Sequence, residues 1–308
     1  MDQPEYMDKK YFGQIKLGLI QRGLAIPTLI HGLSEVSRGV CSAEPGEEIT
    51  LALAEDFIVK TTLNPPDKDG PKLISQQDRL RLYMEEGETD VSIIPVPDFL
   101  KQQLKKRTPV SENICLDGYC FNVFLRAIGK GKELSMPIEA ILSVIQAAFE
   151  EGAADLIQLN MDYSNDDDRG FQRLAPLVEA IKKRFNTFVA LKGFPPLNKN
   201  TIDCVYASGF DIVNFPLEGF FGTAKSKKIM AAEKTYEALE YASSVFSPGT
   251  VLTDLIMSEG SQDKFKEGID RLINSGIIPL ILLQRDSMKE NSSYPNLVEL
   301  AEHMDQAI

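Results

Sequence analysis

The sequence has very few histidines and cysteines and no tryptophan. Two histidines, His31 and His303, and four cysteines occur in 308 residues. Two histidines, one of them close to the C-terminus, are too few for a histidine-rich zinc or non-haem iron site. A Ser-His-Asp triad would depend on His31, and no G-x-S-x-G turn accompanies it. The sequence therefore excludes a histidine-rich metal site and disfavours a serine hydrolase, and we interpret His31 as a turn or helix-end residue.

Positive charge and long apolar runs are scarce as well. The chain has 33 Lys and Arg against 45 Asp and Glu, a formal net charge of -12, and its pI is near 4.8. An acidic chain repels a phosphate backbone, so we expect no nucleic-acid partner. No apolar run reaches the roughly 18 residues of a membrane span, and the first residues lack the apolar segment of a signal peptide. We expect a cytoplasmic protein with no membrane partner and with reduced thiols at Cys41, Cys115, Cys120 and Cys204.

The rest of the composition is that of a folded globular chain, and its pattern changes near residue 112. Hydrophobic residues make up 43% and charged residues 25%, which is typical of soluble domains. Residues 1–112 follow an irregular pattern, and we expect an N-terminal α+β cap region there. Its predicted elements are an amphipathic helix within residues 8–24, a hairpin of Ile49–Leu53 and Phe57–Thr62, a charged helix over Ser75–Glu86, a strand at Val91–Ile94 and a helix at Asp98–Lys106.

Residues 113–308 show a regular alternation of apolar strands and amphipathic helices. Three helices end in a glycine that is followed at once by an apolar strand, at Gly152, Gly209 and Gly276. Glycine suits the left-handed position after a helix, and nearly continuous apolar strands favour a parallel sheet covered on both faces. The predicted strands are Cys120–Arg126, Asp155–Asn160, Thr187–Leu191, Asp211–Phe215, Thr250–Ile256 and Ile278–Leu283.

Six βα units allow either a curled partial barrel or an open doubly wound sheet. No G-x-G-x-x-G follows the first strand, which disfavours a dinucleotide-binding fold. Six units are also fewer than the eight of a complete barrel. We therefore predict an α/β fold, a partial (β/α)6 TIM-type barrel over residues 113–308 with the N-terminal α+β cap before it.

Active sites of such barrels lie where the strands end and the following loops begin. Polar residues occupy these positions, whereas the opposite strand ends carry mostly glycine and short turns. Lys192 and Glu218 are the catalytic candidates. We predict a ligand pocket lined by Arg126, Asn160, Asp162, Lys192, Asn214, Glu218, Asp254, Glu259, Gln284 and Arg285.

Lys192 follows an apolar run and has two interpretations. A desolvated amine there would form a Schiff base with a carbonyl substrate, as in aldolases. We favour the structural alternative, an ion pair with Asp162 or Glu218.

Two loops carry weaker signals. The acidic residues of Asn165–Gly170 suit the N-terminus of the following helix better than a cation. The basic Gly129–Lys132 loop could meet a ligand phosphate but is not a P-loop.

Cys115 and Cys120 lie close together in the sequence CLDGYC. Two thiolates do not complete a tetrahedral zinc site. We therefore favour two half-buried strand cysteines on either side of an Asp-Gly turn, and keep a metal-binding role for the pair as the alternative.

Residues of about 114–290 resemble the radical S-adenosylmethionine superfamily, in its biotin-synthase-like branch. The resemblance is carried by DRGFQRLAPLVEAIKKRF, DCVYASGFDIVNFPLEGF, YASSVFSPGTVLTDLIMSEG and INSGIIPLILLQRD, in that order and spacing. It implies S-adenosylmethionine as a cofactor. By that similarity Asn160 and Asp162 would bind the methionyl amino group of this cofactor. Its adenosyl group would contact Glu218 and the turn formed by Ser258, Glu259 and Gly260.

The sequence departs from this family at its metal motif. Members hold a [4Fe-4S] cluster with three cysteines in the loop after the first strand, whereas residues 126–137 here contain none. We therefore predict a barrel that binds a small polar or S-adenosylmethionine-like ligand without a standard cluster. Two alternatives stay open: a radical enzyme whose atypical cluster uses Cys115, Cys120 and Cys41, and a Schiff-base lyase that uses Lys192. The sequence also leaves open a protein partner or a homo-oligomer.

Overall fold

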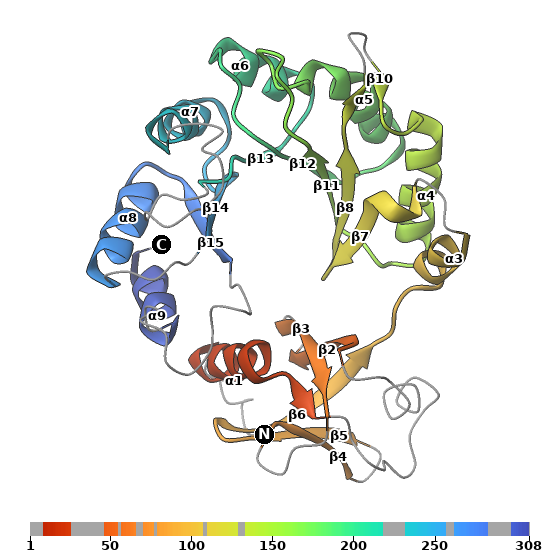
Figure 1. Cartoon of the computed structure of the whole chain (residues 1–308), viewed down its shortest axis with the longest axis vertical. Helices are drawn as coiled ribbons and strands as arrows, with labels where there is room; N and C mark the ends of the chain where they lie inside the picture. The colour runs from red at the N-terminus through yellow and green to blue at the C-terminus, as the bar shows by residue number, and fades with distance from the viewer. Residues whose placement is uncertain are drawn as a thin grey trace, which may run out of the picture. The chain divides into compact units, whose positions relative to one another are not determined.

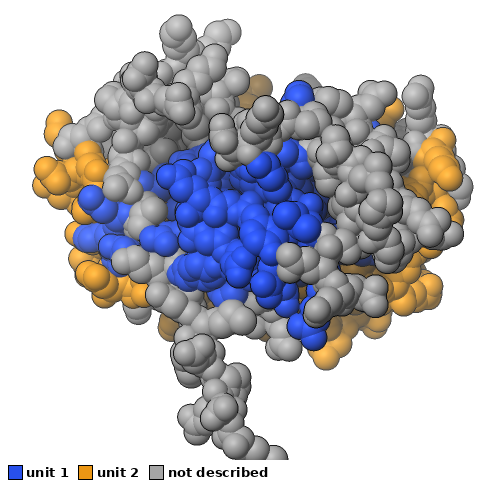
Figure 2. Space-filling view, turned by 90° about the horizontal axis from the view of Figure 1, so that it is seen from below, with its two compact units in different colours: residues 1–96, 296–303 blue, residues 97–295, 304–308 orange. Residues whose placement is uncertain are grey.

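The computed structural model describes residues 9–25, 46–54, 57–65, 70–76, 79–106, 110–128, 133–217, 232–256, 262–282 and 297–307. The chain divides into two compact units, which Figure 2 shows in different colours. Unit 1 comprises Met1–Val96 with Asn296–His303, and unit 2 comprises Pro97–Pro295 with Met304–Ile308. The boundary expected from the sequence lies later, after residue 112, and so counts Asp98–Lys106 with the cap.

Unit 1 is an α+β unit built on a six-stranded sheet (Figure 1). Its strand order is β1-β3-β2-β6-β5-β4, and all neighbours are antiparallel except β1 and β3. The predicted first helix and the predicted β2–β3 hairpin are present. The elements are α1 (Lys9–Arg22), β1 (Leu24–Ala25), β2 (Glu48–Ala54), β3 (Phe57–Asn64), β4 (Lys72–Gln76), β5 (Arg79–Met84) and β6 (Gly87–Ile94).

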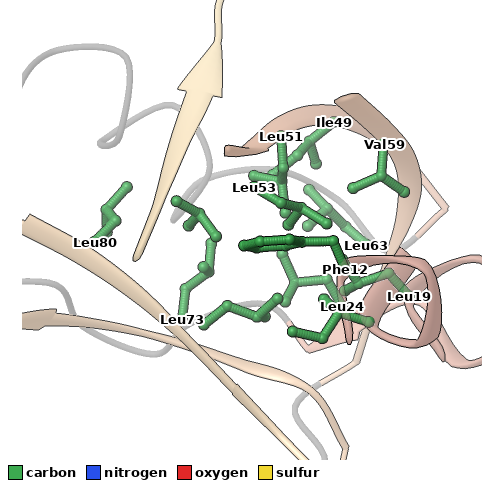
Figure 3. Packing of buried hydrophobic residues seen from close by; sticks show 13 residues of the cluster. Phe12, Leu19, Leu24, Ile49, Leu51, Leu53, Val59, Leu63, Leu73 and Leu80 are labelled. Carbon is green, nitrogen blue, oxygen red and sulfur yellow. The ribbon is translucent and has the colours of Figure 1, made fainter. Parts of the chain in front are cut away.

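The core of unit 1 lies between α1 and one face of the sheet. Helix α1 buries Phe12, Ile15 and Leu19, which share one helix face by their spacing. The Phe12 ring packs in one cluster with Leu24 and with strand residues such as Leu53 (Figure 3). This apolar cluster gives unit 1 a hydrophobic core of its own.

The predicted helix over Ser75–Glu86 is wrong, because this segment forms β4 and β5. Leu80 and Leu82 are buried, whereas the intervening Arg81 is not, so the pattern repeats every two residues. Arg81 contacts Asp90 on the adjacent strand with Nε and Oδ1 3.1 Å apart. The charges that suggested an exposed helix thus form cross-strand pairs on a sheet.

Unit 2 contains a seven-stranded sheet of order β15-β14-β13-β12-β11-β8-β7. Neighbours from β8 to β15 are parallel, and β7 is antiparallel to β8. The strands are β7 (Ile114–Asp117), β8 (Cys120–Leu125), β11 (Leu156–Met161), β12 (Phe188–Lys192), β13 (Ile212–Asn214), β14 (Val251–Ile256) and β15 (Ile278–Leu282). A short hairpin of β9 (Ala127–Ile128) and β10 (Glu133–Leu134) follows β8.

Each parallel strand is connected to the next through helix, and Figure 1 shows these helices along one side of the sheet. The predicted fold class, a partial (β/α)6 barrel with an α+β cap sequence before it, is confirmed by this order. Gly152, Gly209 and Gly276 take the expected left-handed conformation, with φ of 63°, 99° and 74°. The helices are α3 (Asp98–Lys106), α4 (Ile138–Glu150), α5 (Ala175–Arg184), α6 (Asn200–Ala207), α7 (Ala232–Val245), α8 (Gln262–Asn274) and α9 (Leu297–Ala307), with short 3-10 turns η1 (Ser111–Asn113) and η2 (Phe171–Leu174).

The two faces of this sheet differ, contrary to the expectation that both are covered. The outer face, on which the helices pack, is mostly apolar and buried. On the opposite face, which we call the inner face, Phe124 is 41% exposed and Leu280 is 39% exposed. Five side chains of the outer face have no exposed surface: Val123, Leu159, Leu191, Val213 and Leu255.

The edges of the sheet are formed by strands of different kinds. Gly118, with φ of 59°, turns β7 into β8 and brings Asp117 opposite Cys120. The predicted hairpin around the Asp-Gly turn is therefore confirmed. At the other edge, β15 contains Pro279, which has no N–H to donate to a ladder and is typical of edge strands.

Candidate functional site

A row of polar side chains crosses the inner face of the unit 2 sheet. Side chains alternate between the two faces of a strand, so partners in register lie on the same face. Register partners join Asn160 to Lys192, and Lys192 to Asn214. We define the polar row as Asn122, Gln158, Asn160, Lys192, Asn214 and Asp254, from strands β8 to β14.

The first half of the polar row is a cluster of three amides that are linked by hydrogen bonds. Gln158 Nε2 donates to Asn122 Oδ1 at 2.8 Å and to Asn160 Oδ1 at 2.9 Å. Asn160 Nδ2 donates to Asn122 Oδ1 at 3.1 Å. Such a connected network fixes the amide orientations and keeps buried polar atoms hydrogen-bonded.

The second half of the polar row is built around a buried carboxylate. The Asp254 side chain is 3% exposed and forms an ion pair with Lys192, whose side chain is 30% exposed. Asn214 Nδ2 donates to Asp254 Oδ1 at 2.7 Å. The ion pair predicted for Lys192 thus exists, but its partner is Asp254 rather than Asp162 or Glu218. Asp162 instead lies 3.8 Å from Arg126, between Oδ2 and Nε.

One atom of this half is left without a hydrogen bond. Asn214 is 2% exposed, and no donor of the described residues reaches its Oδ1. The carboxylate of Asp254 accepts from Nδ2 and so determines which way the amide points. Flipping the amide would bring two oxygens together. Oδ1 of Asn214 is therefore an acceptor that requires a donor from elsewhere.

Apolar side chains flank the polar row on the same face. Phe124 is the register partner of Asn160, and Leu280 is the register partner of Asp254. Both keep about two fifths of their surface exposed. The inner face thus combines few polar groups with apolar surface, which is the usual composition of small-molecule sites.

Cys120 lies on the same face, next to the amide cluster. Asn122 Nδ2 is 3.7 Å from its Sγ. Burial, with smaller contributions from the neighbouring Asp117 and Cys115, raises the pKa of the Cys120 thiol to about 11. Cys115 is exposed on β7. Among the described residues no three His, Cys, Asp or Glu side chains gather as a metal site would need.

The loop after β11 is held by its own polar groups. Asp168 accepts from the backbone N–H groups of Gly170 at 2.9 Å and Gln172 at 3.1 Å. The prediction that these acidic residues stabilise the N-terminus of the following helical turn is therefore supported. Arg169, with φ of 57° and 4% exposed, donates from Nε to the carbonyl of Pro195 at 3.3 Å. Its guanidinium also bonds Ser164 O at 2.9 Å and so ties the loops after β11 and β12 together.

The structure brings together four of the predicted site residues, Asn160, Lys192, Asn214 and Asp254, while Arg126 and Asp162 form a separate exposed pair. Sequence reasoning missed Asn122 and Gln158. Their signal was a polar residue at the centre of an apolar strand, in CFNVFL and LIQLNM. Outside the described residues lie Glu218, Ser258, Glu259, Gly260, Gln284, Arg285, Cys41, His31 and the 129–132 loop.

Comparisons with known proteins give little overlap. No protein family matches the chain, and no curated protein matches it. Solved structures with some similarity include a dihydropteroate synthase from Coxiella burnetii in complex with pteroic acid, at 12% identity and a TM-score of 0.32, covering 54% of this chain and 72% of that one. A dihydropteroate synthase from Yersinia pestis gives 14% identity, a TM-score of 0.33 and coverages of 56% and 77%. A domain of a Pyrococcus furiosus chitinase has 14% sequence identity and a TM-score of 0.38, and the match covers 69% of this chain and 79% of that one.

The resemblance to the radical S-adenosylmethionine superfamily is wrong. No family matches the chain, and the similar structures named above are two synthases and a chitinase. The βα repeat that produced the resemblance is shared by barrels of many unrelated activities. Cys115 and Cys120 lie in the β7–β8 hairpin, so they are not in a loop after a parallel strand.

None of the helices in the described ranges has both the length and the apolar composition needed to cross a membrane.

Proposed function

We propose that unit 2 binds a small polar ligand on the inner face of its parallel sheet, at Lys192, Asn214 and Asp254. The observation that carries this proposal is the buried Oδ1 of Asn214, which no described residue satisfies. A buried polar atom without a partner costs about 1–3 kcal/mol. A ligand that donates a hydrogen bond to Oδ1 removes this cost when it binds.

The charges of the site support binding rather than covalent chemistry. Lys192 and Asp254 together carry no net charge, so a neutral ligand meets no repulsion. The Asp254 carboxylate pairs with the charged ammonium of Lys192, whereas a Schiff base begins with a neutral amine. The geometry therefore favours Lys192 as a hydrogen-bond donor to the ligand. Arg126 and Asp162, both about two-thirds exposed, would lie at the rim.

A panel of small polar fragments tests the proposal by ligand-observed NMR. We expect fragments that bind the native chain to lose about tenfold or more in affinity in Asn214→Leu and in Lys192→Met, since a lost hydrogen bond in a buried site has this effect. Lys183→Met is the matched control, because Lys183 is exposed on α5 and pairs with Glu179. Equal binding of every fragment by all four proteins would contradict the proposal.

A further inference from the structure

We infer that the ligand presents a lactam edge to the site, a ring N–H beside a ring carbonyl. This inference rests on the proposed function and names the ligand's chemical class. The N–H would donate to Asn214 Oδ1, and the carbonyl would accept from Lys192 Nζ. The side chains of Asn214 and Lys192 lie close together, because Asn214 Nδ2 and Lys192 Nζ contact the two oxygens of the same Asp254 carboxylate.

The free hydrogen-bonding groups of the polar row are few, and this limits the ligand. The NH2 groups of Gln158 and Asn160 donate to the other amides of the cluster, and that of Asn122 donates to Cys120. A sugar, with hydroxyls around its ring, would find few unsatisfied partners on this part of the face. A ligand with one polar edge fits better.

The polarity of the two free groups determines what that edge must be. An ammonium has three donors, and within the described residues Lys192 places one on Asp254. Lys192 therefore still offers donors, while Asn214 Oδ1 offers an acceptor. A ligand carboxylate would suit Lys192 but would place its negative charge against Oδ1. A ligand amine would suit Oδ1 but would be repelled by the ammonium. A neutral edge with a donor beside an acceptor satisfies both.

A ring is what holds such an edge together. A secondary amide in an open chain is trans and points its N–H and carbonyl in opposite directions, whereas a small ring holds the bond cis, with both groups on one edge. Phe124 on β8 and Leu280 on β15 are exposed on the inner face, each two strands away from Lys192 or Asn214, and offer apolar surface to the part of the ligand beyond the ring.

Four probes test the inference: 2-pyridone, 1-methyl-2-pyridone, benzoate and benzylamine. The first has the lactam edge, the second lacks its N–H, and the last two carry a single charge. Affinities are measured by ligand-observed NMR titration of the full chain. We expect 2-pyridone to bind about tenfold or more tightly than its N-methyl derivative, because the derivative leaves Asn214 Oδ1 unpaired.

The same titrations in Asn214→Leu and Lys183→Met complete the test. In Asn214→Leu the two pyridones should bind equally, and in Lys183→Met the native difference should persist. Circular dichroism shows that each variant is folded. Benzoate or benzylamine binding more tightly than 2-pyridone, with loss in Asn214→Leu or Lys192→Met, overturns the lactam inference but keeps the proposed function. No preference between the two pyridones, or no binding by any probe, overturns the inference. The fragment panel then decides the proposed function separately.

Discussion

The two faces of the parallel sheet in unit 2 are made by alternate residues of the same strands, yet they differ completely. On β12, Leu191 has no exposed surface and lies on the outer face, whereas its neighbour Lys192 belongs to the polar row on the inner face. One face consists of close-packed apolar side chains, and the other combines a hydrogen-bonded network with exposed apolar surface. The buried core and the exposed inner face are separated here by a single step along a strand, so substitutions one residue apart should have different consequences.

The largest effect is expected on the outer face. Leu191→Ala removes a fully buried side chain and should lower the free energy of unfolding by about 3 kcal/mol, through lost burial and the remaining cavity. Urea denaturation measures the change. The control on the same strand is Phe188→Ala, because Phe188 is 63% exposed and should cost under about 1 kcal/mol. Similar losses in both variants would contradict the separation of the two faces.

The second effect concerns the thiol on the inner face. The thiolate is the reactive form, and burial raises the pKa of Cys120 from an ordinary 9.0 to about 11. At pH 8 its thiolate fraction is therefore about a hundredfold lower than that of an ordinary thiol. Alkylation of variants that each keep one cysteine should be much slower at Cys120 than at the exposed Cys204.

The rate at Cys120 should keep rising as the pH approaches 11, because the thiol loses its proton there. The unfolded chain releases this proton at a lower pH than the folded chain. The stability linked to it is therefore present below pH 9 and is lost as the pH rises toward 11. Equal alkylation rates at Cys120 and Cys204 at pH 8 would show that the inner face does not bury this thiol.

The third effect is on the ion pair. Asp254→Asn leaves the Lys192 ammonium without its carboxylate and should lower the free energy of unfolding by about 2 kcal/mol. The double variant Lys192→Met with Asp254→Leu removes both charges. It should recover much of this loss, because an unpaired charge is costlier than an apolar pair. Chemical denaturation of the native chain, Lys192→Met, Asp254→Leu and the double variant gives the coupling energy, and strict additivity would contradict the pairing.

The smallest effect on stability is expected at the unsatisfied amide. Asn214→Leu removes the hydrogen bond to Asp254 but also removes the buried Oδ1 that has no partner in the described chain. These contributions oppose each other, so the free energy of unfolding should change by less than about 1 kcal/mol. Thermal and urea unfolding measure it. A loss above about 2 kcal/mol would mean that the fold satisfies Oδ1, and that the atom is not kept for a ligand.

Most of the fold follows from local sequence pattern. Apolar runs such as DLIQL predicted β11, and a glycine such as Gly276 predicted where a helix ends. The same reasoning failed for Ser75–Glu86, where charges that pair across strands resembled an exposed helix face. Local pattern cannot show which strand a charged residue will meet.

The candidate site was predictable only in part for the same reason. Asn160 and Lys192 stand at strand ends and could be selected there, whereas Asn122 and Gln158 lie within strands and become a cluster only through register. The partner of Lys192 could not be found by sequence proximity, because Asp254 lies on a strand two positions away in the sheet.

From β11 to β15, each strand of the unit 2 sheet pairs with the strand of the same sheet that was made just before it. A chain that emerges gradually during synthesis can therefore extend this sheet one βα unit at a time, without waiting for a distant partner. Lys192 is added before Asn214, and Asp254 comes last of the three. The trio is complete only when β14 has joined the sheet, so a ligand that needs all three residues would bind a growing chain only after β14 is in place.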